Sequence, residues 1–107
     1  MTSGYSSNIG TSEFLYIVYV LMKNKINKIR KISMNDNTDI RELHTLVGDV
    51  QEALNKMVES LDFNKEEAKE MASIYVNISN LLNKAVLERD DKLFQDIILS
   101  IEQLNLS

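Results

Sequence analysis

The stretch FLYIVYVLMKNKINKIRKI, residues 14–32, decides the fold class of the chain. Its first nine residues carry no charge and no side-chain amide, so a membrane anchor, a buried strand and a helix all have to be considered. Nine helical residues span roughly 14 Å, whereas the hydrocarbon core of a bilayer is about 30 Å thick, so the run is too short to cross a membrane. The apolar pattern continues as Ile26, Ile29 and Ile32, a spacing that a strand does not produce. The stretch therefore predicts a helix over about residues 13–33.

Three further helical patterns follow, each preceded by residues that are typical of a helix N-terminus. Asp39 with Glu42 resembles a capping box that opens the second helix, and Asn64 with Glu67 is expected to cap the third. The break ERDD, residues 88–91, precedes the fourth helix, with one of its two aspartates as N-cap. The apolar positions expected to form the core are Phe14, Ile17, Val18, Leu21, Met22, Ile29, Ile32, Ile40, Leu43, Val47, Val50, Leu54, Met57, Leu61, Ala68, Met71, Ala72, Tyr75, Ile78, Leu82, Ala85, Val86, Leu93, Phe94, Ile97, Ile98, Ile101 and Leu104.

Helices joined by short connections run antiparallel to their neighbours, so the sequence predicts an all-α, antiparallel up-down-up-down four-helix bundle. The bundle is expected to be one domain over residues 13–107, because 107 residues leave no room for a second core. Residues 1–12 are small and polar, and we expect them to form a flexible N-terminal tail. Gly48, in the middle of the second helix, is expected to permit close packing against a neighbouring helix.

The composition narrows the compartment and the class of partner. A net charge of −4 argues against nucleic acid as the main partner, and the absence of cysteine suits a reducing compartment. The residues before the apolar run contain no basic side chain, so the N-terminus does not read as a signal peptide. We therefore expect a cytoplasmic protein that does not insert into a membrane.

The sequence offers little for catalysis. His44 is the single histidine, so neither a two-histidine zinc site nor a paired Glu-x-x-His di-iron site can be assembled, and no metal or cofactor is expected. The three glycines are isolated from one another, so there is no phosphate-binding loop. The chain is not expected to be an enzyme. The basic run after the apolar stretch is more typical of a solvated face than of a nucleic-acid or lipid site.

Two helix faces are candidates for partner contacts. On a helical wheel Tyr16, Tyr19 and Val20 fall opposite the expected core face of the first helix, which predicts an exposed apolar patch. An irregular bundle or the N-terminal tail could instead cover them. The polar side of the third helix carries amides where Lys and Glu are usual, and amides can bond to an adjacent chain without burying charge, although a plain solvated face is the other interpretation. The residues concerned are Ser73, Asn77, Asn80 and Asn83.

The second half of the chain, SLDFNKEEAKEMASIYVNISNLLNKAVLERDDKLFQDIILSIEQL (residues 60–104), resembles the flagellar secretion chaperone family FliS. In the first helix FLYIVY resembles the family's apolar segment that closes in a tyrosine, here Tyr19, and Tyr5 with Asn8 is similar to the family's N-terminal Tyr and Asn. The chain departs from the family where Val20 stands in place of an Asp or Asn. The positions that carry the match in the second half are Ser60, Leu61, Asp62, Tyr75, Leu82, Ala85 and Asp90.

The resemblance implies a cytoplasmic bacterial chaperone that binds the C-terminal segment of flagellin. Such a protein prevents premature polymerisation, keeps flagellin competent for secretion and releases it at the flagellar export apparatus. It also implies that the client docks partly as helices on apolar grooves, and that the N-terminal segment covers part of that surface when no client is bound. A homodimerisation module, a weak homo-oligomer and a regulator that binds a different flagellar protein through the same surface stay open. The expected partner-binding residues are Tyr5, Asn8, Tyr16, Tyr19, Val20, Ile74, Tyr75 and Asn77.

Overall fold

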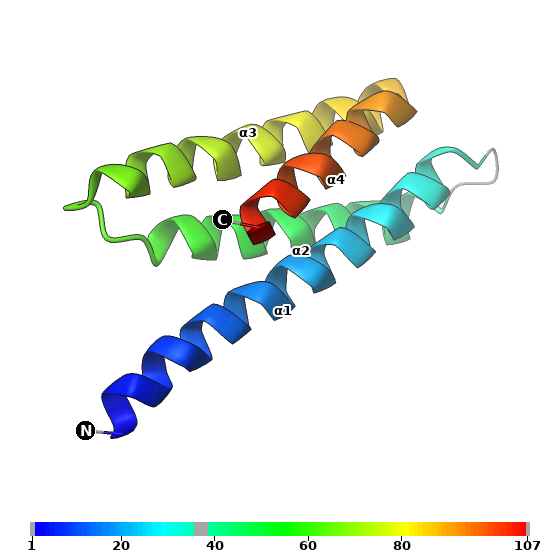
Figure 1. The fold of residues 1–107 in the computed structure, drawn as a ribbon. Coiled ribbons are helices and arrows are strands. Elements are labelled where there is room, and N and C mark those ends of the chain that lie inside the picture. Colours follow the sequence, from blue (N-terminus) through cyan, green and yellow to red (C-terminus); the bar gives the residue numbers. More distant parts are fainter. Residues whose placement is uncertain (1, 36–38, 107) are drawn as a thin grey trace.

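The chain folds into four α-helices packed as an antiparallel bundle (Figure 1). The computed structural model describes residues 2–35 and 39–106, with side chains for residues 15–35 and 39–104. Neighbouring helices pack in the order α1, α2, α3, α4 and back to α1, and α1 also touches α3 across the diagonal. The predicted up-down-up-down bundle is therefore confirmed. The helices are α1 (Thr2–Ser33), α2 (Ile40–Glu59), α3 (Glu66–Glu88) and α4 (Asp91–Leu106).

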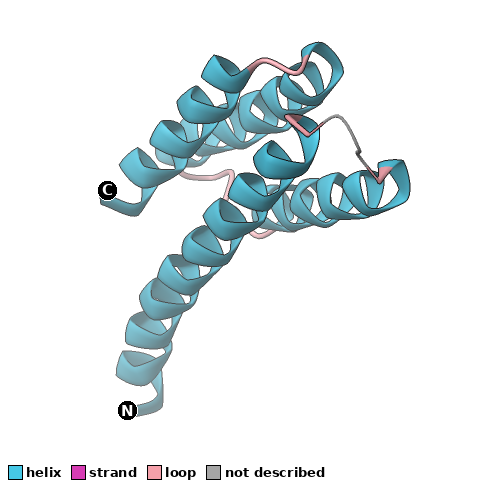
Figure 2. Cartoon of the chain, turned by 90° about the vertical axis from the view of Figure 1, so that its right-hand side faces the viewer, coloured by secondary structure: helices cyan, strands magenta, loops and turns pink. Residues whose placement is uncertain are grey.

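Helix α1 begins much earlier than the sequence pattern predicts. It starts at Thr2 rather than near residue 13, so the segment expected to be a tail continues the helix. The small polar residues of this segment carry no apolar periodicity, and for this reason the pattern placed the start later. Figure 2 shows the N-terminal part of α1 projecting away from the other three helices. That this segment is flexible stays a prediction.

The starts of α2 and α4 follow the capping pattern in the sequence. Asp39 is the N-cap of α2, and its carboxylate accepts hydrogen bonds from the backbone N–H groups of Arg41 at 3.0 Å and Glu42 at 3.3 Å. Asp90 accepts in the same way from the N–H of Lys92 at 3.0 Å, just before α4. Each carboxylate satisfies amide groups that have no partner within the helix.

The predicted cap of α3 at Asn64 is wrong. The residue before the helix is Lys65, which makes no side-chain capping bond. Asp62 instead accepts a hydrogen bond from the backbone N–H of Asn64 at 3.0 Å, and this bond shapes the turn between α2 and α3. The turn therefore uses the carboxylate of Asp62, two residues before the asparagine that the sequence pattern indicates.

The core face of α1 is rotated from the predicted one. Ile26 and Ile29 are fully buried, and steps of three and four residues back from them lead to the buried Met22 and Tyr19. Phe14, also predicted for the core, lies outside the described side chains. Of the predicted core residues with described side chains, three are exposed, namely Ile17, Leu21 and, on α2, Ile40. The largest fully buried side chains are Tyr75, Phe94, Ile26, Ile29, Leu54, Ile78, Leu82, Ile97, Ile101 and Val50.

The two ends of the bundle differ. At one end, which we call the closed end, the guanidinium of Arg30 on α1 forms a two-bond ion pair with Asp91 on α4, at 2.5 and 2.7 Å. Beside it, Nε of Arg89 donates to the backbone carbonyl of Ser33 at 2.8 Å. Arg89 ends α3 in the left-handed conformation, with φ 51° and ψ 46°, where glycine is the usual residue. These contacts join α1 to the connection between α3 and α4.

At the opposite end, the open end, α4 does not reach the turn between α2 and α3 (Figure 1). Its 16 residues extend about 24 Å, whereas the 23 residues of α3 extend about 35 Å. The first turns of α3 and the last turns of α2 therefore lack the cover that α4 gives to the rest of the bundle.

The prediction that Gly48 permits close packing against a neighbouring helix is wrong. It is exposed on α2, and a Cβ atom added there would meet nothing within 4 Å. The position has room for a side chain.

Candidate functional site

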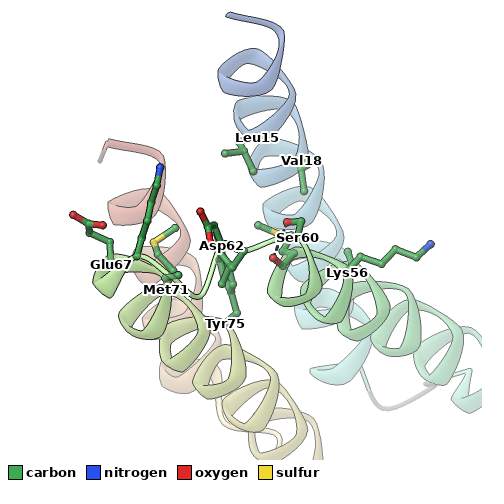
Figure 3. A pocket seen from close by; sticks show the side chains of 13 residues that line it. Leu15, Val18, Lys56, Ser60, Asp62, Glu67, Met71 and Tyr75 are labelled. Carbon is green, nitrogen blue, oxygen red and sulfur yellow. Dashed lines mark hydrogen bonds between the residues drawn. The ribbon is translucent and has the colours of Figure 1, made fainter. Parts of the chain in front are cut away.

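An apolar groove of about 620 Å³ lies at the open end, between the N-terminal half of α1 and the end of α2 (Figure 3). Figure 3 shows Leu15 and Val18 on one wall and Met71 on the other, with Asp62 between them. The groove is lined by Leu15, Val18, Ala53, Lys56, Met57, Ser60, Leu61, Asp62, Lys65, Glu67, Ala68, Met71 and Tyr75.

The groove follows from the lengths and directions of the helices. Helix α1 diverges from α2 toward its N-terminus, and α4 ends before this level (Figures 1 and 2). Leu15, Val18 and Met71 pack against the core but stay partly exposed, because no neighbouring element covers them. When a partner buries exposed apolar surface, the removal of that surface from water contributes roughly 25 cal/mol of favourable free energy per Å². The groove is thus a place where added apolar groups bind favourably.

Charged side chains occur at the rim of the groove rather than in its apolar floor. Lys56 and Lys65 are exposed, as are Asp62 and Glu67, so both signs of charge are present. The floor is formed by apolar side chains such as Ala68 together with the ring of Tyr75. An apolar floor with a polar rim fits the apolar face of an amphipathic helix.

Tyr75 also belongs to a buried pair that ties α1 to α3. Its hydroxyl lies 2.7 Å from that of Tyr19, and one of the two donates the hydrogen bond. Burial, and then the bond to Tyr19, raises the pKa of Tyr75 well above its ordinary value. The two side chains are 2% and 4% exposed. Each ring therefore contributes to the core while its hydroxyl has a partner.

The location of Tyr19 corrects the prediction that it lies on the outer face of α1. The core face predicted for α1 includes Phe14, Val18 and Leu21, but the buried isoleucines in the second half of the helix set a different rotation. Tyr16 does lie outside, 57% exposed, and Val20 is half-buried. The outer apolar patch exists, but Ile17 and Leu21 belong to it in place of Tyr19.

The predicted residues on α3 divide between the groove and the surface. Among the predicted site residues with described side chains, Tyr75 alone lines the groove, while Ile74 and Asn77 are exposed. Of the neighbouring amides, Asn83 accepts a hydrogen bond from Nε2 of Gln51 at 2.8 Å, so it joins α3 to α2 within the chain. The side chains of Tyr5 and Asn8 lie outside the described residues.

The sequence did not predict the groove, although most of the apolar residues that line it were assigned to the core. Val18, Met57, Leu61, Ala68 and Met71 were all assigned to the core stripes. No feature of the local apolar pattern separates these positions from the core positions that α4 covers. A core position with no helix opposite becomes a groove position.

Other chemical sites were considered on the described part of the chain. Among the side chains of residues 15–35 and 39–104, no three from His, Cys, Asp or Glu are grouped so that they could hold a metal ion. None of the described helices is both long and apolar enough to cross a bilayer. The single histidine, His44, is exposed on α2.

No family model matches the chain, and no curated protein matches it in sequence.

Proposed function

We propose that the protein is a non-enzymatic chaperone that binds an apolar helical segment of a client protein in the groove at the open end. The single observation that carries the proposal is the apolar surface of α1, α2 and α3 that α4 leaves uncovered. A client helix placed there supplies the missing fourth layer. Recognition is then of the helix-in-groove kind, in which the apolar face of an amphipathic helix enters the groove.

The side chains of the groove suit an apolar helix rather than a small polar ligand. Met57 and Met71 have unbranched, flexible side chains that adapt to irregular surfaces, as in proteins that accept several helical targets. Tyr75, fixed by its bond to Tyr19, provides a rigid base. Together they combine a fixed floor with adjustable walls.

The client we propose is the C-terminal segment of flagellin. Support comes from the resemblance of residues 60–104 and of the segment ending in Tyr19 to the FliS family. Holding this segment in the groove keeps it from polymerising in the cytoplasm until the subunit reaches the export apparatus. The polar rim, with Lys56 and Glu67, then faces the polar side of the client helix.

Titration of the protein with a flagellin C-terminal peptide in a calorimeter tests the proposal. Leu15→Glu and Met71→Glu each place a carboxylate in the apolar groove and should weaken binding at least about tenfold, because the charge loses water when the client binds. Leu99→Glu is the matched control, since Leu99 is exposed on α4 and does not line the groove. Circular dichroism checks that all variants keep their helices.

An absence of heat and of complex with wild-type protein would sink the flagellin proposal. Equal weakening by Leu99→Glu would show that the groove is not the binding site. A peptide from another flagellar protein, such as the filament cap, in the same titration distinguishes the alternative client.

A further inference from the structure

The outer face of α1 carries a second surface, separate from the groove. Tyr16, Ile17 and Leu21 are 57%, 53% and 56% exposed, and Val20 between them is half-buried. On the helix these four residues lie opposite the buried Met22, and none of them lines the groove. They form an apolar patch two turns long on the side that points away from the bundle.

The same face of α1 becomes basic toward the closed end. Asn24, Lys28 and Lys31 continue the line of Ile17 and Leu21 along the helix and are exposed. We call the residues Tyr16, Ile17, Val20, Leu21, Asn24, Lys28 and Lys31 the outer stripe. The outer stripe is thus apolar in its first part and positively charged in its second.

The charge of α1 contrasts with that of the rest of the chain. Residues 2–33 contain five Lys or Arg and one Glu, a net charge of +4, whereas the remaining residues contain seven Lys or Arg and fifteen Asp or Glu, a net charge of −8. Part of the opposite charge is paired between helices, where Lys25 on α1 lies 3.5 Å from Asp49 on α2, and Arg30 on α1 forms an ion pair with Asp91 on α4.

The lysines of the outer stripe are not neutralised in the same way. Lys28 lies 3.7 Å from Glu42, but both side chains are about half exposed, and such a pair contributes little. Lys31 has no ion pair with any residue that the structure describes. Positive charge therefore remains available on the outer stripe.

We propose that the outer stripe binds an acidic amphipathic helix of a second protein. Its apolar residues lie against Tyr16, Ile17 and Leu21, and its carboxylates lie against Lys28 and Lys31. The two parts of the stripe are seven to fifteen residues apart, so the partner needs carboxylates about 10 to 22 Å along the helix from its apolar residues. Apolar contact supplies most of the affinity, and the charges fix direction and register.

The shape of the surroundings favours a helix over a membrane. The stripe is narrow, and carboxylates flank it on both sides, with Glu42 and Asp49 on α2 and Asp91 on α4. An α-helix is a rod about 10 Å wide and can follow the stripe along α1 alone. A flat anionic bilayer would bring its headgroups against the same carboxylates and be repelled.

A second copy of the chain fits the outer stripe less well. Parallel pairing of two α1 helices would place the lysines against lysines. Antiparallel pairing of the apolar patches would place Lys28 and Lys31 opposite residues 6–9 of the other copy, where the sequence has no acidic residue. Neither arrangement supplies the missing negative charge.

A synthetic helical peptide of about 18 residues, or five turns, serves as the probe. It carries leucines on one face of its first two turns and glutamates on the same face of its later turns, and its binding is followed by fluorescence anisotropy. The comparison peptide has lysines in place of the glutamates. We expect the acidic peptide to bind, the basic peptide to bind at least about tenfold more weakly, and the affinity for the acidic peptide to fall as salt is raised.

Variants locate the contact. Ile17→Ser with Leu21→Ser, and separately Lys28→Glu with Lys31→Glu, should each weaken binding of the acidic peptide at least about fivefold, because these exposed side chains are the ones that contact the partner in the proposal. Leu87→Ser and Lys69→Glu are the controls, since both residues are exposed on α3. The controls should leave the affinity unchanged.

Several results would overturn the proposal: no binding of the acidic peptide, equal binding of the basic one, or equal effects of the α3 controls. Binding to anionic vesicles that the acidic peptide does not displace would assign the stripe to a membrane instead. A concentration-dependent dimer abolished by Leu21→Ser would assign it to a second copy. Met71→Glu, which alters the groove, should leave peptide binding at the outer stripe intact, so this proposal and the flagellin proposal fail independently.

Discussion

The hydroxyl groups of Tyr19 and Tyr75 act as one polar unit inside an apolar core. Their bond, 2.7 Å long, connects two helices that are diagonal in the bundle and satisfies two groups that would otherwise be buried without a partner. A buried hydroxyl that loses its partner costs more than the bond itself contributes, because it has given up its water. The pair should therefore respond to mutation as a unit.

The first prediction concerns this pair. Tyr75→Phe should lower the free energy of unfolding by about 1 to 3 kcal/mol, since it leaves the Tyr19 hydroxyl buried and unpaired, and Tyr19→Phe should act in the same way. The double variant should cost clearly less than the two single changes together. Urea denaturation followed by circular dichroism measures all three. Strictly additive losses would show that the hydroxyls do not depend on each other.

A second residue-scale prediction concerns pH. The hydrogen bond from Arg30 lowers the pKa of Asp91, so the folded state holds the ionised carboxylate more firmly than the unfolded state does. The stabilisation is complete above the ordinary carboxyl pKa, near 4, and is lost as pH falls through the lower pKa of the folded protein. The difference in unfolding free energy between wild type and Asp91→Asn should therefore be constant from about pH 5 to 7 and shrink toward pH 3.

Asp96→Asn is the control for this measurement, because Asp96 is exposed on α4 and makes no ion pair with the described residues. Its difference from wild type should change less with pH. A difference for Asp91→Asn that stays level from pH 7 to 3 would mean that the ion pair does not contribute to stability.

At the scale of single helices, the local sequence decides where a helix starts, whereas packing against other helices decides which of its faces is buried. The caps of α2 and α4 were predictable because Asp39 and Asp90 act on amides two or three residues away. The rotation of α1 was not, because the run FLYIVYVLM is apolar on every side and any rotation buries part of it. The deciding residues were Ile26 and Ile29, in the part of the helix where only one face is apolar.

The prediction at this scale is a stabilising substitution in α2. Gly48→Ala should raise the free energy of unfolding by about 0.5 to 1 kcal/mol, since alanine restricts the unfolded chain and the added Cβ meets no atom. The midpoint of thermal unfolding should rise by several degrees. A lower midpoint would show that a neighbouring helix approaches Gly48 more closely than the structure has it.

The whole molecule is elongated, 55 × 25 × 22 Å. The Arg30–Asp91 ion pair and the Arg89–Ser33 hydrogen bond lie at its closed end, and the groove lies at its open end. The bundle itself was predictable, because four amphipathic patterns with short connections allow few other arrangements. The groove was not, because the same apolar residue is core or groove according to what lies opposite. Met71 and Val18 illustrate this, since nothing in their local sequence distinguishes them from Ile78 or Met22.

The asymmetry of the ends leads to a prediction for hydrogen exchange. Backbone amides of residues 26–29 and 94–97, each range bounded by two fully buried side chains, should exchange slowly, and those of residues 15–18 and 68–71 should exchange faster. Addition of the flagellin peptide should slow exchange in the second group and leave the first unchanged. Mass spectrometry after proteolysis resolves these segments. Uniform exchange along α1 would contradict the distinction between the two ends.

The bonds of Arg30 and Arg89 at the closed end restrict how α1 can move relative to the other helices. Arg30 and Arg89 hold α1 at the closed end, and the Tyr19–Tyr75 hydrogen bond holds it again next to Leu15 and Val18, which form one wall of the groove. The position of this wall therefore depends on both attachments of α1. Because Asp91 bonds to Arg30 on α1, a substitution at Asp91 should therefore change how tightly the groove binds a helix, although Asp91 does not line the groove.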